Sequence, residues 1–307
     1  MLNKIDSENL TPTKALAIYG KSFNWAKRFL GKEMGTNAAI LYRFCRVLDD
    51  MADGDIINGP ERLHKIRDGL LNDYLTNDPL LSDFEFFITS KKLPKLVIIS
   101  LIDGLLGDQN NVLIENEKEL LRYCYRVAST VGILMCKVLN CEKSSAINHA
   151  IDLGIAMQLT NIARDILEDA EMGRRYLPKS WVGDVSPKKI VEISKSPNSQ
   201  EAKNISMGSQ KLLKLAEKYY SSGLAGCSYL PLRAHASIAI AAVVYRQIGI
   251  KIKFKKYSWF NGREFTTINE KLYCSLVAIL LLRRRFFRLA PHKKNLHYAL
   301  KGLPYVK

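Results

Sequence analysis

The chain has 307 residues, 47% of them hydrophobic, and a formal net charge of +16 at pH 7. An apolar fraction of this size is ordinary for a globular protein and excludes a disordered or collagen-like chain. The most apolar late run, residues 276–282, is far shorter than the roughly 20 residues that a membrane-spanning helix needs. The six cysteines include no C-x-x-C pair, and no histidines stand at zinc-finger spacing, so the sequence indicates no zinc site. Without a signal-peptide core near the N-terminus, we expect a cytoplasmic protein in a reducing compartment.

Apolar residues recur with a helical period along nearly the whole chain, and no run alternates as a strand would. The sequence therefore predicts an all-α protein. We expect helices at 12–31, 35–53, 60–75, 81–89, 93–107, 117–139, 144–171, 206–225, 231–253 and 268–287. The polar stretch 183–208 contains two Ser-Pro steps and predicts a long loop rather than a domain linker, because the helices on both sides have the same character.

The expected helix 35–53 ends in a row of carboxylates, Asp49, Asp50 and Asp53. Residues four apart lie one above the other on a helix, so Asp49 and Asp53 project in the same direction. An isolated D-D-x-x-D pattern is weak evidence, since most such runs are solvated faces or helix ends. The apolar sequence before this row makes a solvated face the less natural reading.

The small residues Ala128 and Gly132 share one face of the expected helix 117–139, with Tyr123 near that face. A face of small residues usually packs closely against another helix. The alternative is the wall of an apolar tunnel, in which aromatic faces can stabilise a carbocation. The sequence leaves both interpretations open.

A sharper acidic row lies in the expected helix 144–171, where Gln158, Asn161, Asp165 and Asp169 share one face. Like charges on an apolar helix resist burial. Two such rows, about 110 residues apart, therefore predict a cavity in which they face each other and share cations. Amide and carboxylate oxygens suit Mg²⁺, which bridges carboxylates to substrate phosphates.

Arginines accompany both acidic rows. Arg46 stands three residues before Asp49, and Arg164 adjoins Asp165. Guanidinium groups beside metal-loaded carboxylates can clamp a diphosphate. The alternative is simple ion pairing with the same carboxylates, and the charge pattern does not separate the two readings.

The positive charge is concentrated near the C-terminal end. Residues 251–307 contain 14 Lys and Arg, against only Glu264 and Glu270. Such a balance suits nucleic acid, an anionic membrane surface, a phosphorylated substrate or a solvated basic tail. The run 276–282 is followed by arginines and phenylalanines, a pattern typical of a segment resting on a membrane and equally of a core helix with a basic end.

Several segments resemble the squalene/phytoene synthase family of head-to-head prenyltransferases, over about residues 20–290. They are 21–23, 41–53, 123–128, 153–178, 230–233, 245–249 and 270–272, and the run 153–178 is the most specific. The resemblance implies a single-domain isoprenoid-synthase helical bundle over 1–307, built around a central apolar cavity. Its core would span about 15–290, with a basic C-terminal tail at 291–307.

The resemblance also implies roles for individual residues. The ligands of Mg²⁺, with Mn²⁺ as an alternative, would be Asp49, Asp53, Asn161, Asp165 and Asp169. The diphosphate would contact Lys21, Ser22, Arg46, Gln158, Arg164 and Tyr245, with Arg263 as a weaker candidate. Tyr42, Tyr123, Ala128, Val131 and Gly132 would line the tunnel. Catalysis would rest on Asp49, Asp53, Asp165, Asp169, Arg46 and Tyr123.

The implied reaction joins two geranylgeranyl diphosphates through prephytoene diphosphate to phytoene, the first committed step of carotenoid biosynthesis, without NADPH. The alternative within the family is synthesis of squalene, dehydrosqualene or presqualene diphosphate from farnesyl diphosphate, because one sequence does not reveal cavity depth. Because the product is a hydrocarbon, we also expect peripheral contact with the inner face of a membrane, and downstream carotenoid enzymes as partners.

A different class remains as a rival: a basic helical protein that binds nucleic acid or membrane, with both acidic rows as solvated faces. The apolar surroundings of the two rows argue against it. We therefore expect a prenyl diphosphate as the substrate and no nucleic-acid partner.

Overall fold

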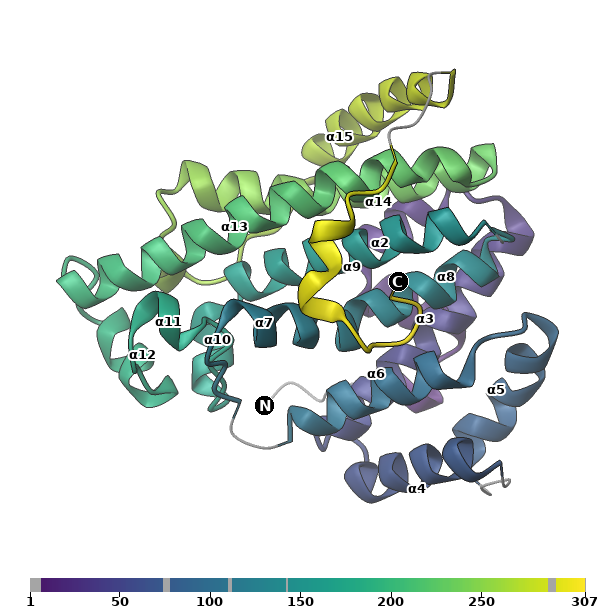
Figure 1. The fold of residues 1–307 in the computed structure, drawn as a ribbon, viewed down its shortest axis with the longest axis horizontal. Coiled ribbons are helices and arrows are strands. Elements are labelled where there is room, and N and C mark those ends of the chain that lie inside the picture. The colour runs from purple at the N-terminus through teal and green to yellow at the C-terminus, as the bar shows by residue number, and fades with distance from the viewer. Residues whose placement is uncertain (1–6, 74–77, 110–111, 142, 287–290, 307) are drawn as a thin grey trace.

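The computed structural model describes residues 7–73, 78–109, 112–141, 143–286 and 291–306. Over these residues every named element is a helix (Figure 1). The N-terminal half contains α1 (Pro12–Tyr19), α2 (Lys21–Lys27), α3 (Lys32–Ala52), α4 (Gly59–Asn72), α5 (Pro79–Ser90), α6 (Lys95–Gly107), α7 (Glu117–Cys124) and α8 (Thr130–Val138). It is followed by α9 (Ser144–Arg164), α10 (Ile166–Glu171), α11 (Lys179–Val182), α12 (Pro187–Ser194), α13 (Gln200–Gly226), α14 (Leu232–Phe254) and α15 (Ile268–Leu281). The all-α prediction is confirmed.

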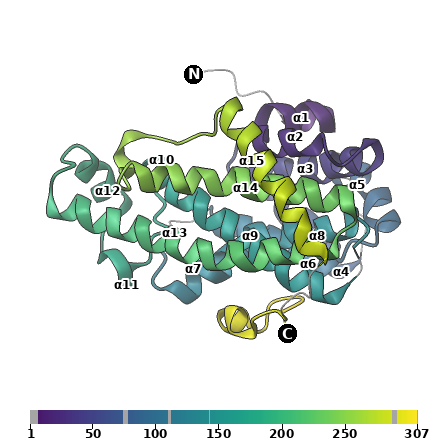
Figure 2. The same ribbon diagram turned by 90° about the horizontal axis from the view of Figure 1, so that it is seen from above.

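Helix α9 is the centre of the bundle. It packs along α13 and also contacts α8 and α14. In Figure 1 it lies below α13 and α14, and α3 and α6 lie below it in turn. Its buried residues fall on nearly every side of the helix, from Ile147 to Ala163, as expected for a helix enclosed by others. Helix α15 lies outside this layer and runs obliquely across α14 (Figure 2).

The expected helix 12–31 is in fact two helices, α1 and α2, which meet at Gly20. The Gly20 N–H still bonds to the Leu16 carbonyl and closes α1. A Cβ at Gly20 would lie 2.9 Å from Cζ of Tyr42, closer than any stable contact. The glycine thus breaks the helix and lets the Tyr42 ring approach it.

Two longer predicted helices carry irregularities where they border the cavity described below. The expected helix 117–139 contains a π-helical turn, Tyr125–Ser129, between α7 and α8. The expected helix 144–171 breaks at Asp165 (φ −108°, ψ 14°). The Asp165 N–H nevertheless bonds to Asn161 O at 2.9 Å, and the Asp169 N–H to Asp165 O at 2.8 Å. The four-residue spacing of the acidic row therefore survives the break.

The prediction of a long loop over 183–208 is wrong. This stretch contains α12 and the first two turns of α13. Its serines are helix caps: Ser186 Oγ accepts from the Lys189 N–H at 3.2 Å, and Ser199 Oγ from the Ala202 N–H at 3.1 Å. Each cap precedes a helical turn, with Pro187 at the first position of α12, so polar residues here start helices.

Residues 291–306, expected as a basic tail, pack back onto the bundle through the 3₁₀ helix η6 (Lys294–Leu300). Figure 1 shows this segment crossing the front of the bundle. Leu300 is fully buried in the main core, and the Tyr125 hydroxyl donates to the Pro304 carbonyl. The ends of the expected 1–307 domain, residues 1–6 and 307, lie outside the described residues. No helix over the described residues is long and apolar enough to cross a bilayer.

Candidate active site

A deep cavity of about 430 Å³ runs through the middle of the bundle. Its walls come mainly from α3, α8, α9 and α14, and most of its lining is apolar. The lining residues of α9 extend from Ala146 to Asn161, which at 1.5 Å per residue is about 22 Å of helix. Asp49, Asp108, Gln158 and Asn161 supply polar groups at one end. The cavity is therefore a long apolar space with one polar end.

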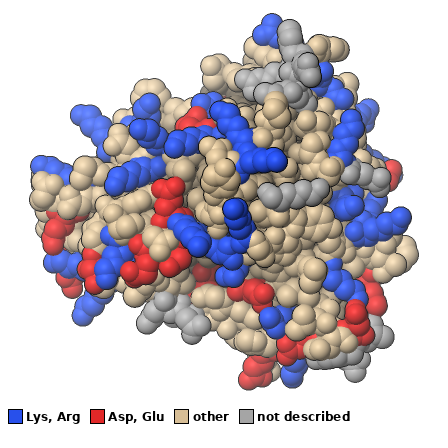
Figure 3. Space-filling model, in the orientation of Figure 1, with Lys and Arg blue, Asp and Glu red and all other residues tan. Residues whose placement is uncertain are grey.

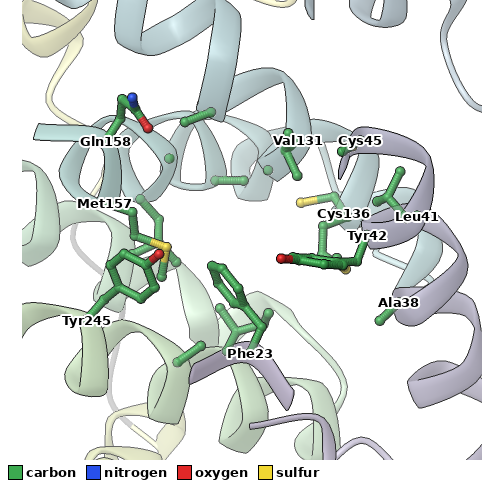
Figure 4. Close-up of a pocket in the computed structure, with 18 of the residues that line it drawn as sticks. Phe23, Ala38, Leu41, Tyr42, Cys45, Val131, Cys136, Met157, Gln158 and Tyr245 are labelled. Carbon is green, nitrogen blue, oxygen red and sulfur yellow. The ribbon is translucent and has the colours of Figure 1, made fainter. Parts of the chain in front are cut away.

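Aromatic rings line the middle of this cavity. Figure 4 shows Phe23, Tyr42 and Tyr245 projecting into the same space from α2, α3 and α14. Phe23 stacks on Tyr245 with 5.2 Å between the ring centroids and lies 6.3 Å from the Tyr42 ring. Because aromatic faces carry negative charge density, this part of the wall is favourable to a cation while remaining apolar.

The first acidic row ends α3. Arg46 Nη1 donates to Asp49 Oδ2 at 3.0 Å, and Arg46 Nη2 donates to Asp50. Asp49 faces the cavity, with 43% of its side chain accessible, whereas the side chain of Asp50 is 6% exposed. Asp50 therefore serves as a buried partner that orients Arg46, and Asp49 is the member of the pair that a bound molecule can reach.

The second acidic row runs from α9 into α10. Arg164 forms a two-pronged ion pair with Asp165, at 2.7 Å and 2.6 Å. Arg263, from the segment between α14 and α15, pairs with Asp165 at 2.9 Å and with Glu168 at 3.0 Å. Two arginines from distant parts of the chain thus converge on Asp165, as they would around a phosphate-bearing ligand.

Arg174 and Asp108 connect the two rows. Arg174 Nη2 donates to Asp53 Oδ1 at 2.8 Å, while its main-chain N–H donates to the Asp169 carbonyl at 2.8 Å. The carboxyl of Asp108 interacts electrostatically with Asp49, Asp53 and Asp169. The rows therefore face each other across one site, although Asp53, Asp165 and Asp169 lie beside the cavity rather than among its lining residues.

Two carboxyl groups of this site hold protons unusually strongly. Asp49 is accessible only to the cavity inside the bundle, and removal from bulk water, reinforced by neighbouring carboxylates, raises the pKa of Asp49 to about 7 and that of Asp169 to about 8. Arg46 lowers the first value and Arg174 the second, but neither offsets the burial. Crowded carboxylates with too little positive charge are what a divalent cation would relieve.

Asn161 supplies an independent test of whether a cation fits. Its Nδ2 donates to Gln158 Oε1 at 3.2 Å, but its Oδ1 is buried and accepts no hydrogen bond from any described residue. A buried acceptor without a donor is costly. An amide oxygen beside carboxylates is a hard ligand, so the residues present suit Mg²⁺.

Asp108 and Tyr176 are site residues that sequence reasoning did not select. Asp108 lines the cavity, and its carboxylate accepts hydrogen bonds from the Tyr123 and Tyr176 hydroxyls, each at 3.0 Å. The two rings stack with centroids 4.6 Å apart. Burial raises the pKa of Asp108 to about 6, although both tyrosines lower it. This network fixes the Tyr123 ring at the polar end of the cavity.

The small residues near the π-helical turn both line the cavity and pack closely against another helix, the two interpretations that the sequence left open. Ala128, Val131, Gly132 and Gly154 line the cavity. A Cβ at Gly132 would also lie 2.7 Å from the Ala150 carbonyl, and one at Gly154 would lie 2.6 Å from Ser129 Cα. Close packing of α8 and the π-helical turn on α9 is thus what forms this wall.

Two predicted diphosphate contacts, Lys21 and Ser22, occupy the first turn of α2 beside the cavity-lining Phe23. Neither lines the cavity itself, and their contact with a diphosphate stays a prediction. The remaining predicted residues lie at the cavity or at the two acidic rows, as described above.

Comparison with known proteins places this geometry in a family. Residues 16–269 match the sequence model of the family described as Squalene/phytoene synthase. The chain belongs to this family. It is 32% identical over 278 residues to a 15-cis-phytoene synthase of Pantoea ananas, a match covering 86% of this chain and 89% of that protein. It is 31% identical over 248 residues to a 4,4'-diapophytoene synthase of Staphylococcus haemolyticus, covering 78% and 85%.

A solved structure agrees with this assignment. A dehydrosqualene synthase crystallised with a ligand superposes with a TM-score of 0.76 at 26% identity, over 92% of this chain and 98% of that one. A squalene synthase of Alicyclobacillus acidocaldarius has the same fold, with a TM-score of 0.67 at 19% identity, over 79% and 91%. The protein is therefore an enzyme, a head-to-head prenyltransferase of the squalene/phytoene synthase family.

Proposed function

We propose that this enzyme joins two geranylgeranyl diphosphates to phytoene in a reaction that depends on Mg²⁺. The observation that carries the proposal is the meeting of two acidic rows and four arginines at the polar end of a long apolar cavity. A prenyl diphosphate has the matching shape: a charged head and an apolar tail.

The residues suit distinct tasks. Asp49, Asp53, Asn161, Asp165 and Asp169 would hold Mg²⁺, which when bound neutralises the diphosphate leaving group and so makes ionisation of the allylic C–O bond easier. Arg46, Arg164 and Arg263 would contact the diphosphate oxygens, exchanging part of their present ion pairs for an anionic ligand. Gln158 and Tyr245, both on the cavity wall, would complete this contact. No proton donor is needed for departure of the leaving group.

The apolar part of the cavity suits the carbocations that follow. The cation of one substrate is attacked by the double bond of the second, and proton loss closes a cyclopropane, giving prephytoene diphosphate. A second ionisation, rearrangement and proton loss yield phytoene without a reductant. Phe23, Tyr42, Tyr123 and Tyr245 present aromatic faces to this space, and the apolar lining excludes the water that would capture a cation.

Substrate length separates two candidate functions. Relatives named phytoene synthase and a relative named 4,4'-diapophytoene synthase match at nearly equal identity. The second candidate is therefore a farnesyl-diphosphate-using enzyme that makes squalene, dehydrosqualene or presqualene diphosphate. The 22 Å stretch of α9 along the cavity, estimated from about 1.5 Å per residue, supports the longer chain.

Product analysis tests this choice. The purified enzyme is incubated with Mg²⁺ and either geranylgeranyl or farnesyl diphosphate, without NADPH, and extracted lipids are identified by mass spectrometry. Phytoene from the twenty-carbon substrate supports the proposal. Turnover of the fifteen-carbon substrate alone would reject it in favour of the second candidate.

We propose further that α15 rests on an anionic bilayer, into which the hydrocarbon product passes. Tyr273, Leu276 and Leu280 are 59–66% exposed on one side of α15, whereas Cys274 and Ala278 face the bundle and are buried. Close to the end of α15, a groove is lined by Lys91, Lys92, Lys137, Lys143 and Arg285 and by no described acidic residue. In Figure 3 Lys and Arg side chains are spread over the face, including its right edge. Apolar side chains beside cations suit a negatively charged lipid surface.

Co-sedimentation with vesicles tests the membrane proposal. We expect the wild type to sediment with phosphatidylglycerol-containing vesicles and a Leu276→Asp, Leu280→Asp variant to remain in solution. Phe86→Asp is the matched control, because Phe86 is 82% exposed but lies on α5. Equal sedimentation of the wild type and the α15 variant would contradict the proposal.

A further inference from the structure

A cluster of histidines and one aspartate lies outside the catalytic site. Asp152, on α9, contacts two imidazoles of the C-terminal segment. His292 Nε2 lies 2.8 Å from Asp152 Oδ2, and His297 Nε2 lies 2.9 Å from Asp152 Oδ1. The two imidazole rings are 4.4 Å apart between centroids. One potential ligand atom from each residue lies within 4.8 Å of the others.

Burial makes this cluster chemically unusual. The side chain of Asp152 is fully buried, and those of His292 and His297 are 8% and 2% exposed. Among the described residues, only these histidines form ion pairs with Asp152. Its partners are the two imidazoles and the Ser222 hydroxyl. A buried carboxylate is normally either paired in this way or bound to a metal ion.

We propose that Asp152, His292 and His297 bind a zinc ion. Two imidazole nitrogens and one carboxylate oxygen are a common zinc ligand set, with water at the fourth position. Ligands about 2.0 Å from a tetrahedral ion lie about 3.3 Å apart. The three ligand atoms already lie within 4.8 Å of one another, so side-chain rotations would bring them to a common ion. Each imidazole would then carry its proton on Nδ1 rather than Nε2.

The surroundings support a metal at this position. The Ser222 hydroxyl, on α13, donates to Asp152 Oδ2, so the carboxylate is already oriented by a hydrogen bond of the kind that fixes metal ligands. The same hydroxyl lies 3.0 Å from His149 Nδ1.

The proposed ion has a structural consequence. Its ligands are separated by 140 and 145 residues, so zinc would fasten the C-terminal segment to the central helix. Leu153 and His149, which flank Asp152 on α9, line the substrate cavity. The ion would therefore hold the outer side of the helix whose inner side forms the cavity wall. This site is not predictable from the sequence, because its ligands come together only in the folded chain.

Metal content of the purified protein tests the proposal. The chain is produced without a polyhistidine tag, stripped with a chelator, incubated with zinc chloride, desalted in excess Mg²⁺ and analysed by elemental mass spectrometry. We expect one tightly bound zinc per chain in the wild type and loss of most of it in His292→Gln and His297→Gln. Replacement by Co²⁺ should give visible d–d absorption in the wild type alone.

Matched variants separate this site from others. His64→Gln removes an exposed histidine on α4, and Asp49→Asn removes a carboxylate of the catalytic site; both should retain zinc. Far-UV circular dichroism of each variant monitors folding, and zinc should raise the melting temperature of the stripped wild type by several degrees. Zinc uptake by His292→Gln and His297→Gln equal to that of the wild type, or none by the wild type itself, would overturn the proposal.

Discussion

The buried network of Tyr123, Asp108 and Tyr176 predicts a stability change that depends on pH. Tyr176→Phe removes one of the two hydroxyls that donate to Asp108, at 3.0 Å, and leaves the ring in place. A hydrogen bond to a charged group contributes about 1.5–3 kcal/mol, and one between neutral groups about 0.5–1.5 kcal/mol. The cost of the variant should therefore depend on whether Asp108 is ionised.

The direction follows from the pKa of Asp108. Its folded-state pKa, about 6, lies above its ordinary value of 3.8. The folded protein thus binds more protons than the unfolded chain in this range, and this group's contribution to stability falls as pH rises from about 4 through 6. Loss of a tyrosine donor destabilises the ionised form further. We expect Tyr176→Phe to lower the free energy of unfolding by about 1.5–3 kcal/mol at pH 8 but by only about 0.5–1.5 kcal/mol at pH 5.

Urea unfolding at both pH values, in the presence of a chelator, measures these differences. Tyr220→Phe is the matched control, because the buried Tyr220 hydroxyl bonds to the neutral hydroxyl of Thr160 at 3.1 Å. This control should cost about 0.5–1.5 kcal/mol at both pH values. An equal cost of Tyr176→Phe at pH 5 and pH 8 would refute the reasoning.

Three further predictions follow from the site and its walls. The pKa of Asp49 is raised to about 7 and that of Asp169 to about 8, so Mg²⁺ must displace protons from these carboxyl groups when it binds. Titration calorimetry should therefore show tighter Mg²⁺ binding at pH 8.5 than at pH 6.5. An Mg²⁺ affinity that does not change with pH would contradict this prediction. Asp169→Asn should raise the melting temperature of the metal-free protein more at pH 8 than at pH 4, since the folded-state pKa of about 8 lies above the ordinary value of 3.8 and the cost of ionised Asp169 grows between them. An unchanged melting temperature at pH 8 would count against it. Gly154→Ala should destabilise the fold by about 1–3 kcal/mol, because the alanine Cβ would lie 2.6 Å from Ser129 Cα. Gly107→Ala is the control and should not destabilise the fold, because a Cβ at this position would have no atom within 4 Å. Equal melting temperatures for the two variants would exclude the packing argument.

Local sequence patterns were enough to predict the helices and the spacing of the carboxylates along them. Helical periodicity and the four-residue spacing of the carboxylates need no tertiary information, so the all-α class followed directly. The ends of helices were less predictable. The break at Gly20 and the π-helical turn at Tyr125–Ser129 arise from close contacts with Tyr42 and α9, which the sequence does not display.

Residues that act through tertiary contacts escaped sequence reasoning. Asp108 stands alone at the end of α6, and only folding places it between Tyr123 and Tyr176. A search for paired carboxylates does not find Asp108, because an isolated charged residue carries no periodic signal. Arg174 was predictable as an arginine beside the second acidic row, but its pairing with Asp53 of the first row was not.

Diphosphate release tests the central claim, that the two acidic rows form one Mg²⁺-dependent site, most directly. Release of diphosphate from geranylgeranyl diphosphate is measured in the wild type and in the Asp53→Asn and Asp169→Asn variants. Asp184→Asn is the control, because the Asp184 side chain is 75% exposed and, among the described residues, forms an ion pair only with Lys179. We predict Mg²⁺-dependent release in the wild type and the control, and its loss when either row is altered. Undiminished release by Asp53→Asn or Asp169→Asn would contradict a shared site.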